Sequence, residues 1–321
     1  MEIYSIIDFE TLMRSGFTSE VMRSPEPPKK WDIPKKNGGV RTIYHPASKV
    51  KLIQYWLINS VLINLPIHEA AYAFIKNRSI KKNALRHASA RNKYYVKIDL
   101  KDFFPSIHYD DFEYAFKKYR DHIDYPEKLD SELLPLIKGV CFISDLTLPI
   151  GFPTSPFIAN FVAREFDEKL TKNLNSIDRL NATYTRYADD IIISTNKKGA
   201  SKQIINSVKS TLRNIKPDFK INPKKIKICS ASGGSIIVTG LKVCDDFHIT
   251  LHKKTKDNVR LLLSLLSKGN LKKDDYNKLS GYILYTKSID PHFYTKLNRR
   301  FFKEIKFLEN YHNKKIKNPT N

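Results

Sequence analysis

Acidic residues inside two segments that favour β-strands constrain this chain more than any other feature of it. Apolar and polar residues alternate over Tyr94 to Leu100, which is the period of a half-buried strand, and Asp99 lies on its polar face. Tyr184 to Thr195 predicts two short strands around a turn at Ala188 to Asp190, a hairpin with an acidic tip. The β-forming flanks would make the two motifs neighbours in one sheet, so three carboxylates are expected to meet at one edge of it.

Each motif alone also has a bland interpretation, because an Asp at a strand end usually forms a turn and an Asp pair usually forms a solvated tip. The composition shifts the balance toward chemistry. The chain carries 56 Lys and Arg against 33 Asp and Glu, a formal net charge of +23, together with 18 Phe and 17 Tyr. So many cations indicate a polyanionic partner, since Lys and Arg gain affinity by displacing phosphate counterions; an anionic membrane surface is the competing partner.

Phosphoryl transfer gives a chemical reason for grouping carboxylates. It is catalysed mainly by positioning and by neutralisation of charge, and two Mg²⁺ about 3.5–4 Å apart can clamp the attacking and leaving oxygens. Mg²⁺ prefers carboxylates, waters and substrate phosphates to an all-protein cage. Two or three carboxylates on adjacent strand ends would supply that geometry.

The composition also limits the compartment. The three cysteines, Cys141, Cys229 and Cys244, show no spacing typical of a disulfide framework or a structural zinc site, which favours a reducing cytoplasm. The first residues lack the basic start of a signal peptide. The most apolar stretch, Leu52 to Leu65, is too short to span a bilayer and predicts a buried helix instead. A cytoplasmic protein without a membrane partner is expected.

Residues typical of loops and helix starts divide the first part of the chain. Residues 24 to 39, rich in Pro, Lys and Gly, predict a loop that leads into a strand at Val40 to Tyr44. Ser155 and Pro156 predict the N-cap and the first residue of a helix, whose apolar stripe continues to Leu170.

The composition of the chain changes near Asp245: the residues that follow are more basic and predict helices. Apolar residues spaced by three and four predict one helix that ends at Gly269, and Asp290 followed by a Pro predicts the cap of a later one. We therefore expect an α+β fold with a core over residues 31–245, a basic helical domain over residues 246–321, and an extension of opaque role over residues 1–30.

Together these motifs resemble a reverse transcriptase, and within that group a retron reverse transcriptase. The resemblance covers roughly residues 35 to 245: YADD at Tyr187 to Asp190 is similar to the catalytic tetrad, and Asp99 matches the Asp of the first palm motif. It implies a right-hand polymerase with fingers, a palm built on an antiparallel sheet, and a helical thumb that binds RNA. It also implies that Asp99 and Asp189 hold two Mg²⁺, with Asp190 in support and Leu100 in the same metal-binding set.

The same resemblance implies a site for the incoming dNTP. Asp102 and Phe103 match positions beside the triphosphate, and Phe104 matches the steric gate, a bulky ring that disfavours a ribose 2′-OH by clash. Arg41 matches the fingers arginine, whose guanidinium suits phosphate. Gly151 lies in LPIGFPTSP, which resembles the family's LPQGxPTSP segment with Ile in place of the common Gln, and which shapes the backbone near the nucleotide.

Lysines in two segments are further candidates. FKINPKKIKIC, from Phe219 to Cys229, resembles the motif whose lysine protonates the pyrophosphate leaving group; Lys225 is the candidate, and the adjacent Lys224 stays open as the alternative. Lys35 and Lys36 in the fingers loop either assist at the triphosphate or are solvated.

Two short segments narrow the family. Asn83 and His87 stand in an NAxxH pattern, and Thr239 and Gly240 complete a VTG pattern, and both patterns match signatures of retron enzymes. The resemblance implies that these four residues help to hold the cognate RNA and its primer end. A packed His87 without a ligand stays an equal alternative.

The resemblance implies a concrete reaction. The enzyme would bind one structured non-coding RNA from its own operon, prime on the 2′-OH of a guanosine in it, and copy part of it into single-stranded DNA that stays joined to the RNA. Retron systems are associated with anti-phage defence, usually with a separate effector protein from the same operon. Two alternatives stay open: another bacterial reverse transcriptase, either group II intron-like or defence-associated, and a non-catalytic RNA-binding scaffold with a polymerase fold. Phe104 argues against an RNA-dependent RNA polymerase.

Overall fold

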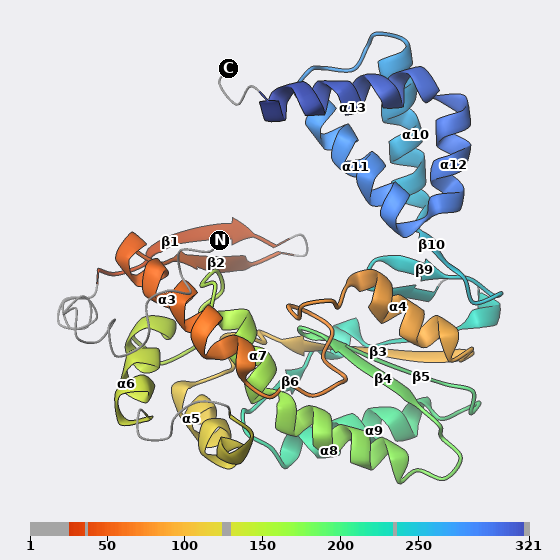
Figure 1. The fold of residues 1–321 in the computed structure, drawn as a ribbon. Helices are drawn as coiled ribbons and strands as arrows, with labels where there is room; N and C mark the ends of the chain where they lie inside the picture. Colours follow the sequence, from red (N-terminus) through yellow and green to blue (C-terminus); the bar gives the residue numbers. More distant parts are fainter. Residues whose placement is uncertain (1–25, 36–37, 124–129, 234–235, 318–321) are drawn as a thin grey trace. The chain divides into compact units, whose positions relative to one another are not determined.

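The computed structural model describes residues 26–35, 38–123, 130–233 and 236–317, with side chains up to Tyr311. Most of the predicted extension over residues 1–30, and Lys36 in the fingers loop, lie outside the described residues. The chain divides into two compact units (Figure 1). The first comprises the chain up to Arg78 and residues 95–228, and the second comprises residues 79–94 and residues 229 onward.

A sheet of strands from distant parts of the sequence organises the first unit. Its strand order is β4-β5-β3-β6, with β4 antiparallel to β5 and β3 antiparallel to β6. The strands are β3 (Tyr94–Lys101), β4 (Thr183–Tyr187), β5 (Asp190–Thr195) and β6 (Lys220–Ile221), and a fifth strand, β7 (Lys227–Ser230), also pairs with β3. The two predicted acidic motifs therefore do lie on neighbouring strands, β3 and β5.

Helices cover this sheet and supply most of the apolar core. Buried residues of α3, β3, α5, α6, α7 and α8 form one continuous cluster, and α8 packs against α9 (Figure 1). The helices are α3 (Ser48–Ser60), α5 (Tyr109–Lys118), α6 (Asp130–Cys141), α7 (Ser155–Val162), α8 (Arg164–Asn175) and α9 (Ser201–Arg213), with short 3-10 turns at Leu62–Asn64, Arg120–His122 and Pro223–Lys225.

The loop predicted over residues 24–39 is wrong in part. β1 (Lys29–Pro34) pairs antiparallel with β2 (Val40–His45) to form a hairpin, in which Ile33 stands opposite Arg41. The Pro and Gly residues mark only the end of β1 and the turn, where the Lys35 amide donates to the Gly39 carbonyl at 2.9 Å. Lys and Trp inside β1 are exposed, so the strand lacks the apolar alternation by which it could have been recognised.

Two predicted helices differ from the observed ones at their ends. The helix expected over Leu52 to Leu65 is α3, which begins earlier and gives way to a 3-10 turn after Val61. The helix opened by Ser155 does begin there, but it ends at Val162, and α8 carries the remainder of the apolar stripe. The Ser155 hydroxyl does not cap the helix; it donates instead to the buried carbonyl of Pro149 at 2.6 Å.

The second unit combines a small sheet with helices. Strands β8, β9 and β10 form an antiparallel meander on which α4 packs, and four helices follow. The elements are α4 (Ile80–Ser89), β8 (Ile236–Val238), β9 (Leu241–Val243), β10 (Ile249–Leu251), α10 (Lys253–Ser267), α11 (Asp275–Ile289), α12 (Pro291–Arg300) and α13 (Phe302–Lys317), with a 3-10 turn at Ala231–Gly233. The predicted boundary near Asp245 falls inside this unit, since the sheet and α4 belong with the helices.

The predicted helices after Asp245 are present. α10 ends just before Gly269, and the Asp290 side chain accepts from the Phe293 amide at 3.0 Å, which caps α12. The helix that Asp290 opens ends at Arg300, and after a break at Phe301 the chain continues as α13. No helix among the described residues is long and apolar enough to cross a membrane.

Candidate catalytic site

The two acidic motifs meet where β3 lies beside the β4–β5 hairpin. The Leu100 amide donates to the Asp189 carbonyl at 2.9 Å, which brings the residue after Asp99 against the hairpin turn. The turn itself consists of Ala188 and Asp189, because Asp190 already pairs with Tyr187 as the first residue of β5. The Asp99 side chain is 11% exposed, and both hairpin aspartates are half-buried, so the solvated-tip interpretation fails.

The electrostatics of this edge disfavour three negative charges. Burial raises the pKa of Asp189 to about 6, with further contributions from the charge of Asp190 and, more weakly, that of Asp99. Burial also raises the pKa of Asp190, although Lys97 opposes the shift. Crowded, partly desolvated carboxylates of this kind are stabilised by a divalent cation, and an all-oxygen donor set suits Mg²⁺.

The three carboxylates are near one another, but their oxygens do not surround a single metal position. Among the residues that the structure describes, they do not form a group in which one oxygen of each lies within 4.8 Å of the other two. Leu100, predicted in the same set, is buried and has only its backbone carbonyl to offer as a ligand.

A lysine provides the counter-charge to Asp99. The Lys225 Nζ lies 2.8 Å from the Asp99 Oδ2, and this hydrogen bond is the main reason why the pKa of Lys225 is raised. The Asn222 amide donates to the Asp99 carbonyl at 2.8 Å, which fixes the 3-10 turn carrying the lysine beside β3. Both adjacent lysines are exposed, and of the two Lys225 is the one that bonds to Asp99.

The residues after β3 divide between surface and core. Asp102 is exposed, has a left-handed φ of 47°, and lies 3.6 Å from the Lys35 Nζ of the β1–β2 hairpin. Phe103 is 4% exposed and stacks on Phe219 at 5.2 Å, so its ring cannot face a nucleotide. Phe104 is half-buried and contacts the ring of Phe74, which is 46% exposed.

The LPIGFPTSP segment packs its backbone directly on β2. The Tyr44 amide donates to the Ile150 carbonyl at 2.8 Å, and a Cβ on Gly151 would lie 2.4 Å from the Tyr44 carbonyl oxygen. Gly151 also has a φ of +109°, which other residues rarely adopt. A glycine is therefore required at position 151, because any side chain there would clash with β2. β2 also carries Arg41, whose side chain is exposed.

A buried ion pair beneath the hairpin turn was missed by the sequence analysis. Arg186 is fully buried and binds Asp167 of α8 through two nitrogens, with its Nη2 at 2.7 Å from the Asp167 Oδ2. Its Nη1 donates to the Asn160 side chain at 3.1 Å and to the Ala188 carbonyl at 3.3 Å. Since Ala188 has a left-handed φ of 55°, the arginine holds the turn that presents Asp189. The available signal was an Arg directly before YADD in a strand otherwise made of Thr and Tyr.

Comparison with known proteins decides the family. The family model described as "Reverse transcriptase (RNA-dependent DNA polymerase)" matches residues 33–270. The chain belongs to the reverse transcriptase family. It is an RNA-directed DNA polymerase by this membership, as its motifs predicted.

Two relatives of this reverse transcriptase cover nearly its whole length. It is 74% identical to the retron Ec73 reverse transcriptase of Escherichia coli, over 98% of this chain and 99% of that protein. It is 30% identical to the retron Ec83 reverse transcriptase of the same species, over 95% and 98%. These likenesses confirm the predicted placement among the retron reverse transcriptases.

Solved structures confirm the fold. Telomerase from Candida albicans, in complex with the TWJ fragment of telomeric RNA, superposes with a TM-score of 0.52 at 12% identity and covers 94% of this chain and 63% of that one. Apo telomerase from Candida tropicalis gives a TM-score of 0.51 at 13% identity. The α+β polymerase fold expected of a reverse transcriptase is therefore present.

The two retron signatures of this reverse transcriptase form one packed module in the second unit. Thr239 and Gly240, with φ values of 45° and 85°, make the two-residue turn between β8 and β9, and the Thr239 hydroxyl donates to the Ile80 carbonyl at 3.1 Å. Asn83 and His87 lie one helical turn apart on the buried face of α4, and burial lowers the pKa of His87 to about 3. Both side chains are fully buried, so they do not offer a surface to RNA in this conformation.

Proposed function

We propose that this retron reverse transcriptase copies part of a structured non-coding RNA into single-stranded DNA, starting from the 2′-OH of a guanosine in that RNA. The product would stay joined to its template RNA. The proposal further assigns the enzyme a role in anti-phage defence together with a separate effector protein from the same operon. The family membership supports the polymerase reaction, and the resemblance to retron enzymes supports the priming mode.

The acidic edge carries the proposal for catalysis. Asp99, Asp189 and Asp190 would bind two Mg²⁺, which neutralise charge on the triphosphate and the attacking hydroxyl when bound. The observation that supports this is the juxtaposition of β3 with the YADD turn, through the bond from the Leu100 amide to the Asp189 carbonyl.

The leaving group also needs a proton. Attack of the hydroxyl on the α-phosphorus forms one P–O bond and breaks another, and pyrophosphate departs with a new negative charge. Lys225 is protonated and stands beside Asp99, so we assign its Nζ as the donor of that proton.

Residues flanking this edge would orient the dNTP. Arg41 and Lys35 on the β1–β2 hairpin supply cations for phosphate, and the half-buried ring of Phe104 would exclude a ribose 2′-OH by clash. Asp102 and the backbones of Phe103 and Gly151 complete the proposed binding site.

The test is incubation of the purified protein, with its co-purifying RNA, with Mg²⁺ and labelled dNTPs. We expect DNA that remains attached to RNA, and its loss in Asp189→Asn. The matched control is Asp178→Asn, because that carboxylate is 87% exposed and its ion pair is with the exposed Arg179. DNA made freely on any primer-template without a linked product would favour another kind of reverse transcriptase. Absence of any product from the wild-type protein would favour the scaffold alternative.

A further inference from the structure

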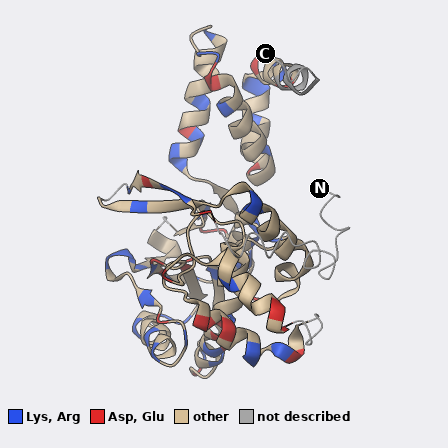
Figure 2. Cartoon of the chain, turned by 90° about the vertical axis from the view of Figure 1, so that its left-hand side faces the viewer, with Lys and Arg blue, Asp and Glu red and all other residues tan. Residues whose placement is uncertain are grey.

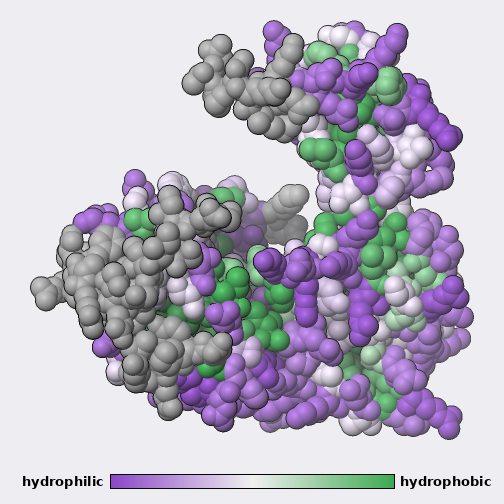
Figure 3. Space-filling view, in the orientation of Figure 1, coloured by the Kyte–Doolittle hydropathy of each residue, from purple (hydrophilic) through white to green (hydrophobic). Residues whose placement is uncertain are grey.

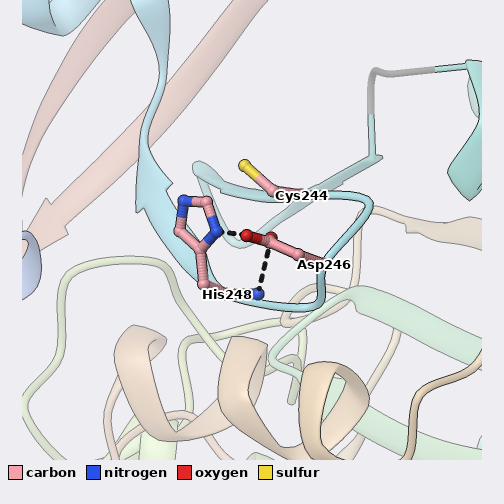
Figure 4. Close-up of side chains that lie close together, drawn as sticks. All are labelled: Cys244, Asp246 and His248. Atoms are coloured by element: carbon pink, nitrogen blue, oxygen red, sulfur yellow. Dashed lines mark hydrogen bonds and ion pairs between the residues drawn. The ribbon is translucent and has the colours of Figure 1, made fainter.

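The loop between β9 and β10 gathers three potential metal ligands outside the acidic edge. Val243 and Ile249 pair across the two strands, so residues 244–248 form a five-residue hairpin loop. Cys244, Asp246 and His248 alternate in this loop, and one ligand atom from each lies within 4.8 Å of the other two (Figure 4). Within the described ranges of the chain, this is the one group of three or more such residues with that spacing.

The backbone of the loop holds these side chains together. The Cys244 amide donates to the His248 carbonyl at 2.9 Å, and the Phe247 amide donates to the Cys244 carbonyl at 2.8 Å. Phe247 has a left-handed φ of 66°, and the guanidinium of Arg91, from the same unit, lies 5.9 Å from the centre of its ring. A site built on a tight, cross-bonded turn loses little conformational freedom when it binds a ligand.

We propose that Cys244, Asp246 and His248 bind one Zn²⁺. A thiolate, an imidazole and a carboxylate together are a donor set that Zn²⁺ accepts, whereas Mg²⁺ prefers oxygen ligands alone. Zn²⁺ bonds of about 2.0–2.3 Å place neighbouring ligand atoms roughly 3–4 Å apart. The three ligand atoms lie within 4.8 Å of one another, so the side chains are already gathered on the scale of such a site.

Binding changes one existing contact. In the structure, the His248 Nδ1 hydrogen-bonds the Asp246 Oδ1, which also accepts from the His248 amide at 3.3 Å (Figure 4). The metal replaces the proton between ring and carboxylate, and the two side chains already face each other. Three protein ligands leave a fourth tetrahedral position, which water fills.

The site is distinct from the proposed catalytic one in both place and chemistry. It belongs to the second unit, at the hairpin that leads through β10 into α10, whereas Asp99 and the YADD turn belong to the first. The cysteine spacing did not indicate a structural zinc site, because such sites typically combine two or more cysteines, or pairs of cysteines and histidines, whereas this group has one Cys, one Asp and one His. The Cys-x-Asp-x-His spacing becomes a chelate only when the intervening residues form a tight loop. The expected role of the metal is to stabilise this loop, because an ion bound by the folded chain alone stabilises that state.

The experiment uses the full chain, purified free of metal under reducing conditions and titrated with Co²⁺ as a spectroscopic stand-in for Zn²⁺. We expect a thiolate-to-Co²⁺ charge-transfer band that saturates at one equivalent and disappears when Zn²⁺ is added. Cys244→Ser should abolish the band, and His248→Gln should weaken Co²⁺ binding at least tenfold. Cys229→Ser, which removes a half-buried cysteine outside the cluster, is the control and should keep the band.

Two further measurements make the result decisive. Zn²⁺ should raise the melting temperature of the wild-type chain and of Asp189→Asn, and leave that of Cys244→Ser unchanged. Excess Mg²⁺ should not displace Co²⁺ from the thiolate. A wild-type titration without a thiolate band, or a band that survives in Cys244→Ser, would overturn the site whatever the polymerase activity of the preparation.

Discussion

At the scale of single residues, the half-buried Asp189 carboxyl lies in an environment unlike that of a surface aspartate. Burial and the neighbouring Asp190 and Asp99 charges raise its pKa to about 6, so the folded chain retains a proton on it well above the usual range. That proton competes with a cation for the same oxygens.

The proposed Mg²⁺ dependence should therefore change with pH. As the pH falls below about 6, Asp189 becomes protonated, and we expect the Mg²⁺ concentration for half-maximal DNA synthesis to rise by roughly tenfold per pH unit. The measurement is a Mg²⁺ titration of primer extension at several pH values on either side of 6. An unchanged Mg²⁺ requirement at the acidic end would show that Asp189 does not bind the metal.

Gly151 allows a second test at this scale, because two different constraints act on it. Gly151→Ala places a Cβ 2.4 Å from the Tyr44 carbonyl oxygen and also strains a φ of +109°, whereas Gly199→Ala strains a φ of +78° with nothing within 4 Å. We expect Gly199→Ala to cost about 1–2 kcal/mol of stability from strain alone, and Gly151→Ala to cost more. Urea unfolding of the two variants measures the difference, and equal losses would rule out the close approach of the segment to β2.

At the scale of elements, the sequence predicts what depends on local periodicity and misses what depends on partners. The alternation around Asp99 and the hairpin pattern around YADD were sufficient to predict that β3 and β5 are neighbours. The Asp290–Pro291 pattern predicted the start of α12. β1 was missed because its side chains are exposed and it is stabilised by pairing with β2. The buried Arg186 was missed because its partner, Asp167, is 19 residues earlier in the chain, on α8.

Breaking the Arg186–Asp167 pair should lower the free energy of unfolding of the first unit substantially. Asp167→Asn leaves the guanidinium buried without its counter-charge, which typically costs about 3–5 kcal/mol, and it should also lower DNA synthesis by releasing the Ala188 carbonyl and the YADD turn. The matched control is Glu113→Gln, which breaks an exposed pair with Lys117 and should cost about 0.5 kcal/mol or less. Equal thermal stability of the two variants would contradict the assignment.

At the scale of the whole molecule, the net charge of +23 dominates. Lys and Arg are distributed over both units, including the helices that follow β10 (Figure 2). The visible surface of those helices is largely hydrophilic, with isolated apolar patches (Figure 3). Exposed apolar side chains on these helices include Leu261, Leu284 and Phe302. A basic surface interleaved with apolar side chains is suited to a folded RNA, where phosphates and unstacked bases are both available.

The predicted thumb can be tested through salt, because each neutralised phosphate contributes to the salt dependence of RNA binding. Affinity for the co-purifying RNA should fall linearly in logarithmic units with rising salt, by about 10³-fold or more between 50 and 200 mM if six or more phosphates are contacted. Replacing the exposed Lys296 and Arg299 on α12 with Gln should lower the slope by about one to two, since each phosphate contact contributes roughly 0.7–0.9. The same double change at Lys202 and Lys209, exposed on α9 of the first unit, should leave it unaltered. Filter binding at four salt concentrations measures all three slopes. A lower slope in the α9 variant alone would show that RNA binds to the first unit and not to the C-terminal helices.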